Sequence, residues 1–164
     1  MPPAFGRRLE MIRSDAVVIG FAEFVDLPKW GIVGLRGKID TGARTSALHV
    51  ENIQEVGNGR VGFDVRLHRK KADRTVHVEA KILRRGRVKP SNGDAQTRFF
   101  VLTTLRIGPV EREIEVSLVD RANMIFRMLV GRTALGHGPL VDPSRRYVLT
   151  RPKKRRTKRP SARP

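Results

Sequence analysis

The sequence contains no cysteine, few aromatic residues, few acids relative to its bases and no long apolar run. Without cysteine the chain cannot form a disulfide scaffold, a cysteine-ligated zinc or iron–sulfur site, or a thiolate nucleophile. No apolar run approaches the roughly 18–20 residues that span a bilayer, and residues 1–13 lack the apolar core of a secretory signal. We therefore expect a cytoplasmic protein that makes no membrane contact.

The excess of basic residues is the strongest feature of the composition. The chain has 34 Lys and Arg against 16 Asp and Glu, which gives a formal net charge of +18. Eight of the bases lie in residues 151–164, which contain no acid, so residues 1–150 hold 26 bases against the same 16 acids. A tail of this composition cannot bury an apolar face, and we expect residues 151–164 to be disordered. The remaining positive charge favours an acidic partner or an acidic peptide substrate.

A nucleic-acid-binding or ribosome-associated protein is one alternative that this charge leaves open. The tail and the basic clusters at residues 66–71 and 84–89 could make weak, salt-sensitive contacts with phosphates. Single-stranded nucleic acid is also held by stacking on exposed aromatic rings, but aromatic residues make up only 5% of this chain, with one Trp and one Tyr. The tail is equally well explained as a solvated end of the chain.

The hydrophobic pattern predicts an all-β protein. Polar and apolar residues alternate over residues 61–68 and 75–82, which is the period of a half-buried strand, and the polar stretch between them predicts a hairpin. Further strands are predicted over residues 16–27, 32–39, 99–107, 112–118, 128–130 and 147–149. Only residues 45–55 and 132–135 favour short helices. We expect a flexible arm over residues 1–14, one β-barrel or sandwich domain over 15–150, and the basic tail over 151–164.

The triplet Asp40-Thr41-Gly42 is the feature with the most evident chemistry. It directly follows an apolar strand, so the carboxylate of Asp40 is placed at the end of a rigid element, and Gly42 permits a close backbone approach. The same triplet is also an ordinary turn sequence, so by itself it does not establish a catalytic site.

A second element strengthens the catalytic interpretation. The apolar run that begins at Met128 ends in Gly131 and Arg132. Together with Asp40-Thr41-Gly42, it resembles the retropepsins, the single-lobed aspartic proteases of retroviral type. In that family the late apolar strand threads through a ψ-shaped loop around the strand that carries the catalytic aspartate.

Other segments narrow the resemblance to one bacterial and archaeal family. They are residues 40–49, the Ser-Asn-Gly turn at 91–93, the threonine-rich strand at 102–108, the Phe-Arg-Met-Leu-Val-Gly-Arg block at 126–132, and Val-Asp-Pro at 141–143. The family carries the label ATP-dependent zinc protease and has been reclassified as retropepsin-like. Its members are often encoded beside, or fused to, ATP-grasp ligases that add amino acids to protein or peptide carboxylates.

The resemblance implies a fold, a mechanism and a site. The fold would be a closed retropepsin-like barrel with a flap hairpin, and the hairpin at 61–82 would be an insertion. Asp40, Thr41 and Gly42 would be catalytic. Because the chain has a single Asp-Thr-Gly, the pair of carboxylates would require a homodimer. The other implied site residues are Ala43, Arg44, Ser91, Asn92 and Gly93 for substrate binding, of which the last three would form the flap tip, and Gly131 and Arg132 for structure. The segment at 91–93 is also consistent with an ordinary exposed hairpin turn.

The chain departs from the family pattern at one position. In retroviral enzymes the arginine that Arg132 matches pairs with an acid four residues after the catalytic aspartate, but here that residue is Arg44. The four histidines have no metal-site spacing and no phosphate-cradling Gly-x-x-x-x-Gly-Lys occurs, so we expect neither a metal nor another cofactor. A retropepsin fold that binds peptides without cleaving them is the second alternative.

Overall fold

The computed structural model describes residues 16–68, 70–71, 73–89 and 93–151. The expected arm at 1–14 and nearly all of the basic tail at 151–164 lie outside these residues. The strands are β1 (Val18–Gly20), β2 (Ala22–Leu27), β3 (Ile32–Asp40), β4 (Ser46–His49), β5 (Glu51–Gly57), β6 (Arg60–Arg66), β7 (Thr75–Val88), β8 (Gln96–Ile107), β9 (Val110–Val119), β10 (Met128–Gly131) and β11 (Leu140–Asp142). A 3-10 turn (Pro28–Trp30) and one short helix, α1 (Arg132–Leu135), complete the described part.

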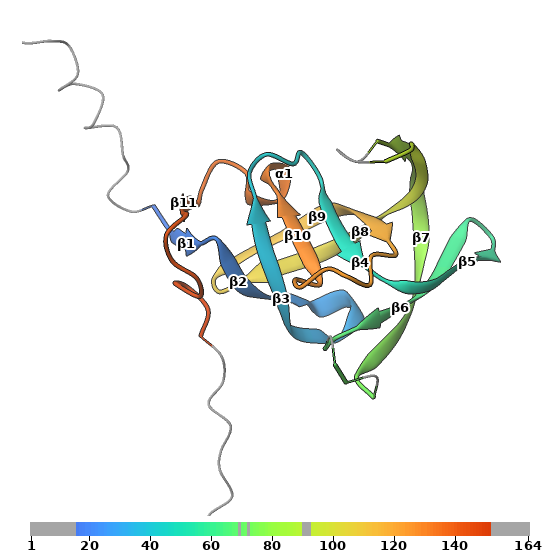
Figure 1. Ribbon diagram of the computed structural model, residues 1–164, viewed down its shortest axis with the longest axis horizontal. Helices are drawn as coiled ribbons and strands as arrows, with labels where there is room; N and C mark the ends of the chain where they lie inside the picture. Colours follow the sequence, from blue (N-terminus) through green and yellow to red (C-terminus); the bar gives the residue numbers. More distant parts are fainter. Residues whose placement is uncertain (1–15, 69, 72, 90–92, 152–164) are drawn as a thin grey trace, which may run out of the picture.

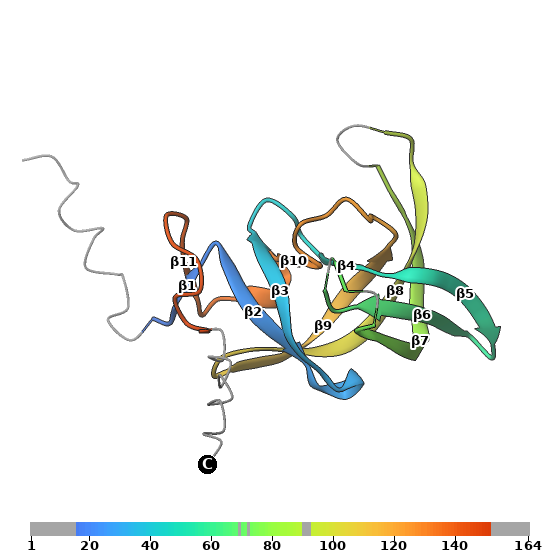
Figure 2. The ribbon, with the colours of Figure 1, turned by 60° about the horizontal axis from the view of Figure 1, so that its bottom comes forward.

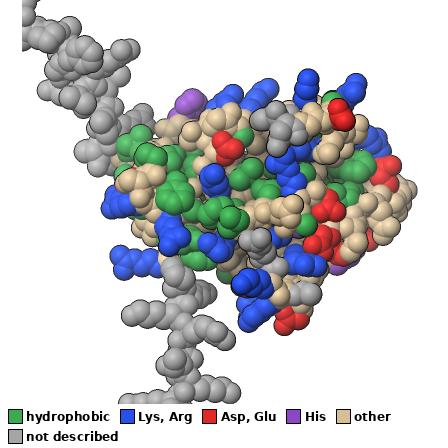
Figure 3. Space-filling view, viewed as in Figure 1, with side chains coloured by type: hydrophobic (Ala, Val, Ile, Leu, Met, Phe, Trp, Pro, Cys, Tyr) green, Lys and Arg blue, Asp and Glu red, His purple; other side chains and the backbone are tan. Residues whose placement is uncertain are grey.

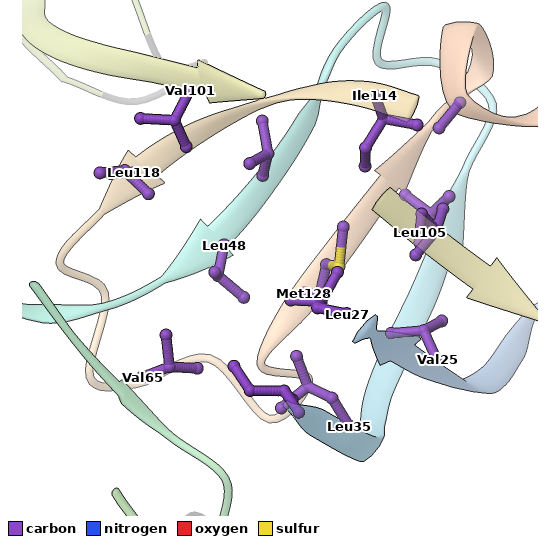
Figure 4. Close-up of a cluster of buried hydrophobic side chains, with 14 of the residues drawn as sticks. Val25, Leu27, Leu35, Leu48, Val65, Val101, Leu105, Ile114, Leu118 and Met128 are labelled. Carbon is purple, nitrogen blue, oxygen red and sulfur yellow. The ribbon is translucent and has the colours of Figure 1, made fainter. Parts of the chain in front are cut away.

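Six strands close into a barrel, which confirms the predicted fold class (Figure 1). They follow the order β2-β3-β10-β4-β9-β8, and β8 returns to β2 where Asp26 lies opposite Arg106. Closure leaves these strands few free edges and encloses a single core. Figure 4 shows Leu48, Met128, Leu105 and their neighbours from several strands pointing into that core.

The same sheet extends from the barrel beyond β8. Strands β7, β6 and β5 continue the hydrogen-bonded order, and the β6–β7 pair is the predicted inserted hairpin. Strand β7 is longer than expected because the basic segment that starts at Arg84 continues the pairing with β8 as far as Val88. The long β7–β8 hairpin rises on the same side of the molecule as the loop that follows β3, as Figures 1 and 2 both show.

Two predicted elements are wrong. Residues 45–55 are not helical: they form β4 and β5, because β4 is paired on both sides, with β10 and with β9. Residues 147–149 are not a strand, because the N–H groups of Val148 and Leu149 donate to the carboxylate of Glu23, at 3.0 Å each, instead of to a neighbouring strand. The short sheet at this end is formed by β11, which pairs in parallel with β1.

On the face shown in Figure 3, charged side chains are dispersed. In Figure 3, Lys and Arg side chains are spread over the visible face, and hydrophobic side chains show through its middle. None of the helices among the described residues has the length and apolar character to cross a membrane.

Candidate active site

Asp40 ends β3 and is held there by its own loop. Its Oδ1 accepts hydrogen bonds from the N–H groups of Gly42 and Ala43, at 3.1 and 3.2 Å, and its residue is only partly buried. The preceding residue, Ile39, is buried in the barrel core. The carboxylate is therefore fixed at the mouth of the barrel, while Thr41 and Gly42 are exposed beside it.

Strand β10 lies between β3 and β4, with Gly131 opposite Asp40 in a parallel register. The loop of residues 41–45 passes over this end of β10. A Cβ atom on Gly131 would lie 2.5 Å from the carbonyl oxygen of Thr45 and 2.9 Å from that of Arg44. This position therefore requires glycine, because two backbones approach each other closely here.

Hydrogen bonds from the start of α1 also hold the loop of residues 41–45 in place. The backbone N–H groups of Arg132 and Thr133 donate to the carbonyl oxygens of Ala43 and Arg44, at 2.9 and 3.1 Å. The hydroxyl of Thr133 also donates to the Arg44 carbonyl at 2.7 Å. The guanidinium of Arg132 donates to the carbonyl of Gly42 at 3.2 Å, so a backbone oxygen takes the place of the acid that this sequence lacks.

Two buried serines complete the support, and sequence reasoning gave them no role. The Oγ of Ser46 accepts the N–H of Gly131 at 3.1 Å, and the hydroxyl of Ser117 donates to the carbonyl of Ser46 at 3.2 Å. Both side chains are nearly inaccessible to solvent. A serine at an inward position of a strand indicates a buried hydrogen bond, but the local pattern of residues 45–55 predicts a helix, so Ser46 is not assigned to a strand from the sequence alone.

Of the three predicted flap residues, the described part of the chain includes only Gly93. Gly93 is exposed near the end of the β7–β8 hairpin, and Ser91 and Asn92 lie outside the described residues. The arms of the hairpin pair from Ile82 opposite Val101 to Val88 opposite Gln96.

Comparison with known proteins identifies the family. Residues 18–152 match the RimB-like family, described as "Retropepsin-like aspartic endopeptidase RimB". The chain belongs to the RimB-like family. The match spans the whole barrel and its inserted sheet, so the resemblance expected from the motifs is confirmed at the level of family and fold.

Relatives of this RimB-like chain include much longer proteins. It is 32% identical over 139 residues to a protein of Shewanella pealeana named "Probable alpha-L-glutamate ligase", and 34% identical over 137 residues to one of Desulfotalea psychrophila with the same name. These matches cover 83% and 80% of the chain but only 30% and 29% of the relatives. A crystal structure of a Legionella pneumophila protein of unknown function (DUF785) superimposes with a TM-score of 0.67 at 26% identity, covering 82% of this chain and 98% of that one.

The histidines of the RimB-like chain lie in separate places. His77 faces Asp64 across the inserted hairpin, with 2.7 Å between Nδ1 and Oδ1, and His68 accepts the N–H of Lys70. His49 is fully buried, and its Nδ1 accepts the N–H of Arg121 at 2.9 Å. Burial, aided by the positive charge of Arg127, lowers the pKa of His49 below its ordinary value. Across the described residues, no three His, Asp or Glu side chains gather as metal ligands would.

Proposed function

We propose that this protein is an aspartic endopeptidase whose catalytic pair is Asp40 from each subunit of a homodimer. The observation that supports this most strongly is the position of Asp40, which is fixed at the barrel mouth by Gly42 and Ala43 and by the hydrogen bonds from α1. The family description as retropepsin-like aspartic endopeptidases agrees with that geometry.

The chemistry requires two carboxylates that share one proton and one water molecule. Two carboxylates this close repel each other when both are charged, so the reaction begins with one carboxylate ionised and the other holding the shared proton. The ionised carboxylate takes a proton from water, whose oxygen attacks the scissile carbonyl carbon, while the protonated carboxyl donates its proton to the carbonyl oxygen. The tetrahedral intermediate then collapses, the C–N bond breaks, and the amine leaves with a proton.

Dimerisation follows from the single Asp-Thr-Gly in the chain. A two-fold axis passing beside Asp40 would bring the two carboxylates together, which is the arrangement that closed symmetric dimers allow. Thr41 and Gly42 are exposed beside Asp40 and are available to such an interface. The β7–β8 hairpin, on the same side as this loop, would close over the peptide and exclude water (Figure 2).

We propose an acidic peptide or protein as the substrate, in the cytoplasm. Residues 1–150 carry ten more bases than acids, and the longer relatives are named for ligation of glutamate, an acidic residue. Electrostatic attraction would raise the local concentration of such a substrate. The names of these relatives also support a role for the chain beside a glutamate ligase.

Cleavage of an acidic peptide library by the wild-type protein and by Asp40→Asn tests the function. We expect Asp40→Asn to lower kcat/KM by at least about a thousandfold, because the amide can neither take nor share the proton. Asp73→Asn, at an exposed aspartate of the inserted hairpin, is the matched control and should leave activity unchanged. A chelator should have no effect. Cleavage that survives Asp40→Asn, or that a chelator abolishes, would contradict the proposal.

Contact with nucleic acid through residues 151–164 is a second role that the charge distribution favours, and it can coexist with catalysis. We expect the full chain to be retained on RNA at low salt and released steeply as salt rises. Deleting residues 151–164 should abolish this retention and leave peptide cleavage intact. Retention that persists after the deletion would assign RNA contact to the barrel instead.

A further inference from the structure

A cavity of about 260 Å³ lies next to the loop that follows Asp40. Ala43, whose N–H donates to Asp40, is part of its wall, and Val88 and Arg98 near the tip of the β7–β8 hairpin form another part. The floor is made by Leu129, Ala47 and Ser117, which lie side by side on β10, β4 and β9. The cavity thus connects the catalytic loop with the hairpin above it.

Three arginines line this cavity, and the described lining includes no acid. Arg44 comes from the catalytic loop, Arg98 from β8 and Arg121 from the segment between β9 and β10. The backbone N–H of Arg121 donates to buried His49, so the backbone at this position is fixed to the core. Like charges gathered without a counter-ion are unfavourable in the free protein.

Arg98 is the least exposed of the three. Its Nε is buried and has no hydrogen-bond partner among the described residues. Burial, together with the nearby charge of Arg121, lowers the pKa of Arg98. Other arginines of the same hairpin are paired: Arg84 with Glu115 and Arg85 with Glu55, each also lying over a phenylalanine ring. Arg98 therefore differs from Arg84 and Arg85 in having a buried guanidinium nitrogen with no hydrogen-bond partner among the described residues.

We propose that this cavity is a carboxylate-binding subsite of the peptide cleft, in which Arg98, assisted by Arg121 and Arg44, binds a carboxylate of the substrate near the scissile bond. The inference rests on the proposed peptidase function. A guanidinium binds a carboxylate through two parallel hydrogen bonds, which would satisfy the buried Nε and offset the unpaired charge. The carboxylate can be a Glu or Asp side chain or the C-terminus of the peptide, and the test distinguishes these two sources.

Peptide binding to the full chain carrying Asp40→Asn tests the subsite without turnover. The probes are fluorescein-labelled hexapeptides of alanine with one Glu placed at each position in turn, their Gln counterparts, and both sets with a free or an amidated C-terminus. We expect an acidic probe to bind about tenfold more tightly than its neutral counterpart. Adding Arg98→Gln should reduce that preference to less than threefold, whereas Arg87→Gln, an exposed arginine of the same hairpin, should preserve it.

The pattern of lost preference identifies the source. A preference that depends on the Glu position and survives amidation assigns a side-chain carboxylate, and one lost on amidation assigns the C-terminus. If Arg98→Gln does not fold by circular dichroism, Arg121→Gln replaces it and should also weaken the preference. An unchanged preference in these folded variants, or no acidic preference in the Asp40→Asn protein, would overturn the subsite. Failure of wild-type cleavage with the acidic preference intact would instead contradict the peptidase function and leave the subsite standing.

Discussion

At the scale of single residues, the site depends on positions where backbones meet. Asp40 and Gly131 lie opposite each other on neighbouring parallel strands, although ninety residues lie between them in the sequence. The carbonyl oxygens of Ala43 and Arg44 accept bonds from the start of α1. The loop is therefore shaped by backbone groups, and the side chains at Gly131 and Ser46 matter because one is absent and the other is a hydrogen-bond acceptor.

Gly131→Ala tests this close approach. The added methyl group would meet the backbone of Thr45 and Arg44, so the loop must move or the strands must separate. We expect the free energy of unfolding to fall by about 2–3 kcal/mol, measured by urea denaturation, and peptidase activity to be lost. Gly138→Ala is the matched control, because no atom lies within 4 Å of a Cβ there. Equal effects of the two substitutions would show that the contact at Gly131 is unimportant.

At the scale of elements, the sequence predicts strands well where alternation is strong. The β6–β7 hairpin and the strands β3, β8, β9 and β10 are found close to their predicted positions. The failures occur where partners distant in sequence decide the outcome. Strand β4 has the local pattern of a short helix but is fixed by β9 and β10, and residues 147–149 resemble a strand but donate to a buried carboxylate.

The same limit applies to the site. Asp40, Gly131 and Arg132 can be identified from sequence motifs. The arginine-lined cavity cannot, because Arg44, Arg98 and Arg121 come from three segments that only the folded barrel brings together. The support from Thr133 is also hidden, since its acceptor is a backbone carbonyl, which every residue possesses.

Glu23 anchors the last described segment to β2. Its buried carboxylate accepts the N–H groups of Gly20, Val148, Leu149 and Thr150 and the hydroxyl of Thr150. Burial by itself would raise the pKa of Glu23, but the hydrogen bonds from Gly20, Thr150 and Leu149 outweigh it and hold the pKa below its ordinary value of 4.5.

Glu23→Gln should therefore change both stability and its pH dependence. The NH₂ group of the glutamine amide would face backbone N–H donors. We therefore expect the free energy of unfolding to fall by about 2–4 kcal/mol near pH 7, measured by urea denaturation. A carboxylate whose pKa is lowered on folding stabilises the protein above pH 4.5 and ceases to do so as the pH falls below that value. The difference between wild type and variant should shrink from pH 6 to pH 3. A constant difference over that range would contradict the role of the charge.

At the scale of the whole molecule, we propose that the barrel provides one half of a catalytic site. It fixes one carboxylate at its mouth, raises a hairpin over the same side, and carries its only Asp-Thr-Gly there (Figures 1 and 2). The arginines around the neighbouring cavity suit an acidic peptide. We therefore expect two subunits to form one active site, and a single barrel to be stable but inactive until it pairs.

Mixing subunits measures this requirement directly. Wild-type and Asp40→Asn proteins are combined in varying ratios at constant total concentration and allowed to exchange partners, and the initial rate of peptide cleavage is recorded for each mixture. If one active site needs Asp40 from both subunits, the rate will fall as the square of the wild-type fraction. A rate that falls in direct proportion to the wild-type fraction would show that each subunit acts alone, and would contradict the proposed dimeric aspartic peptidase.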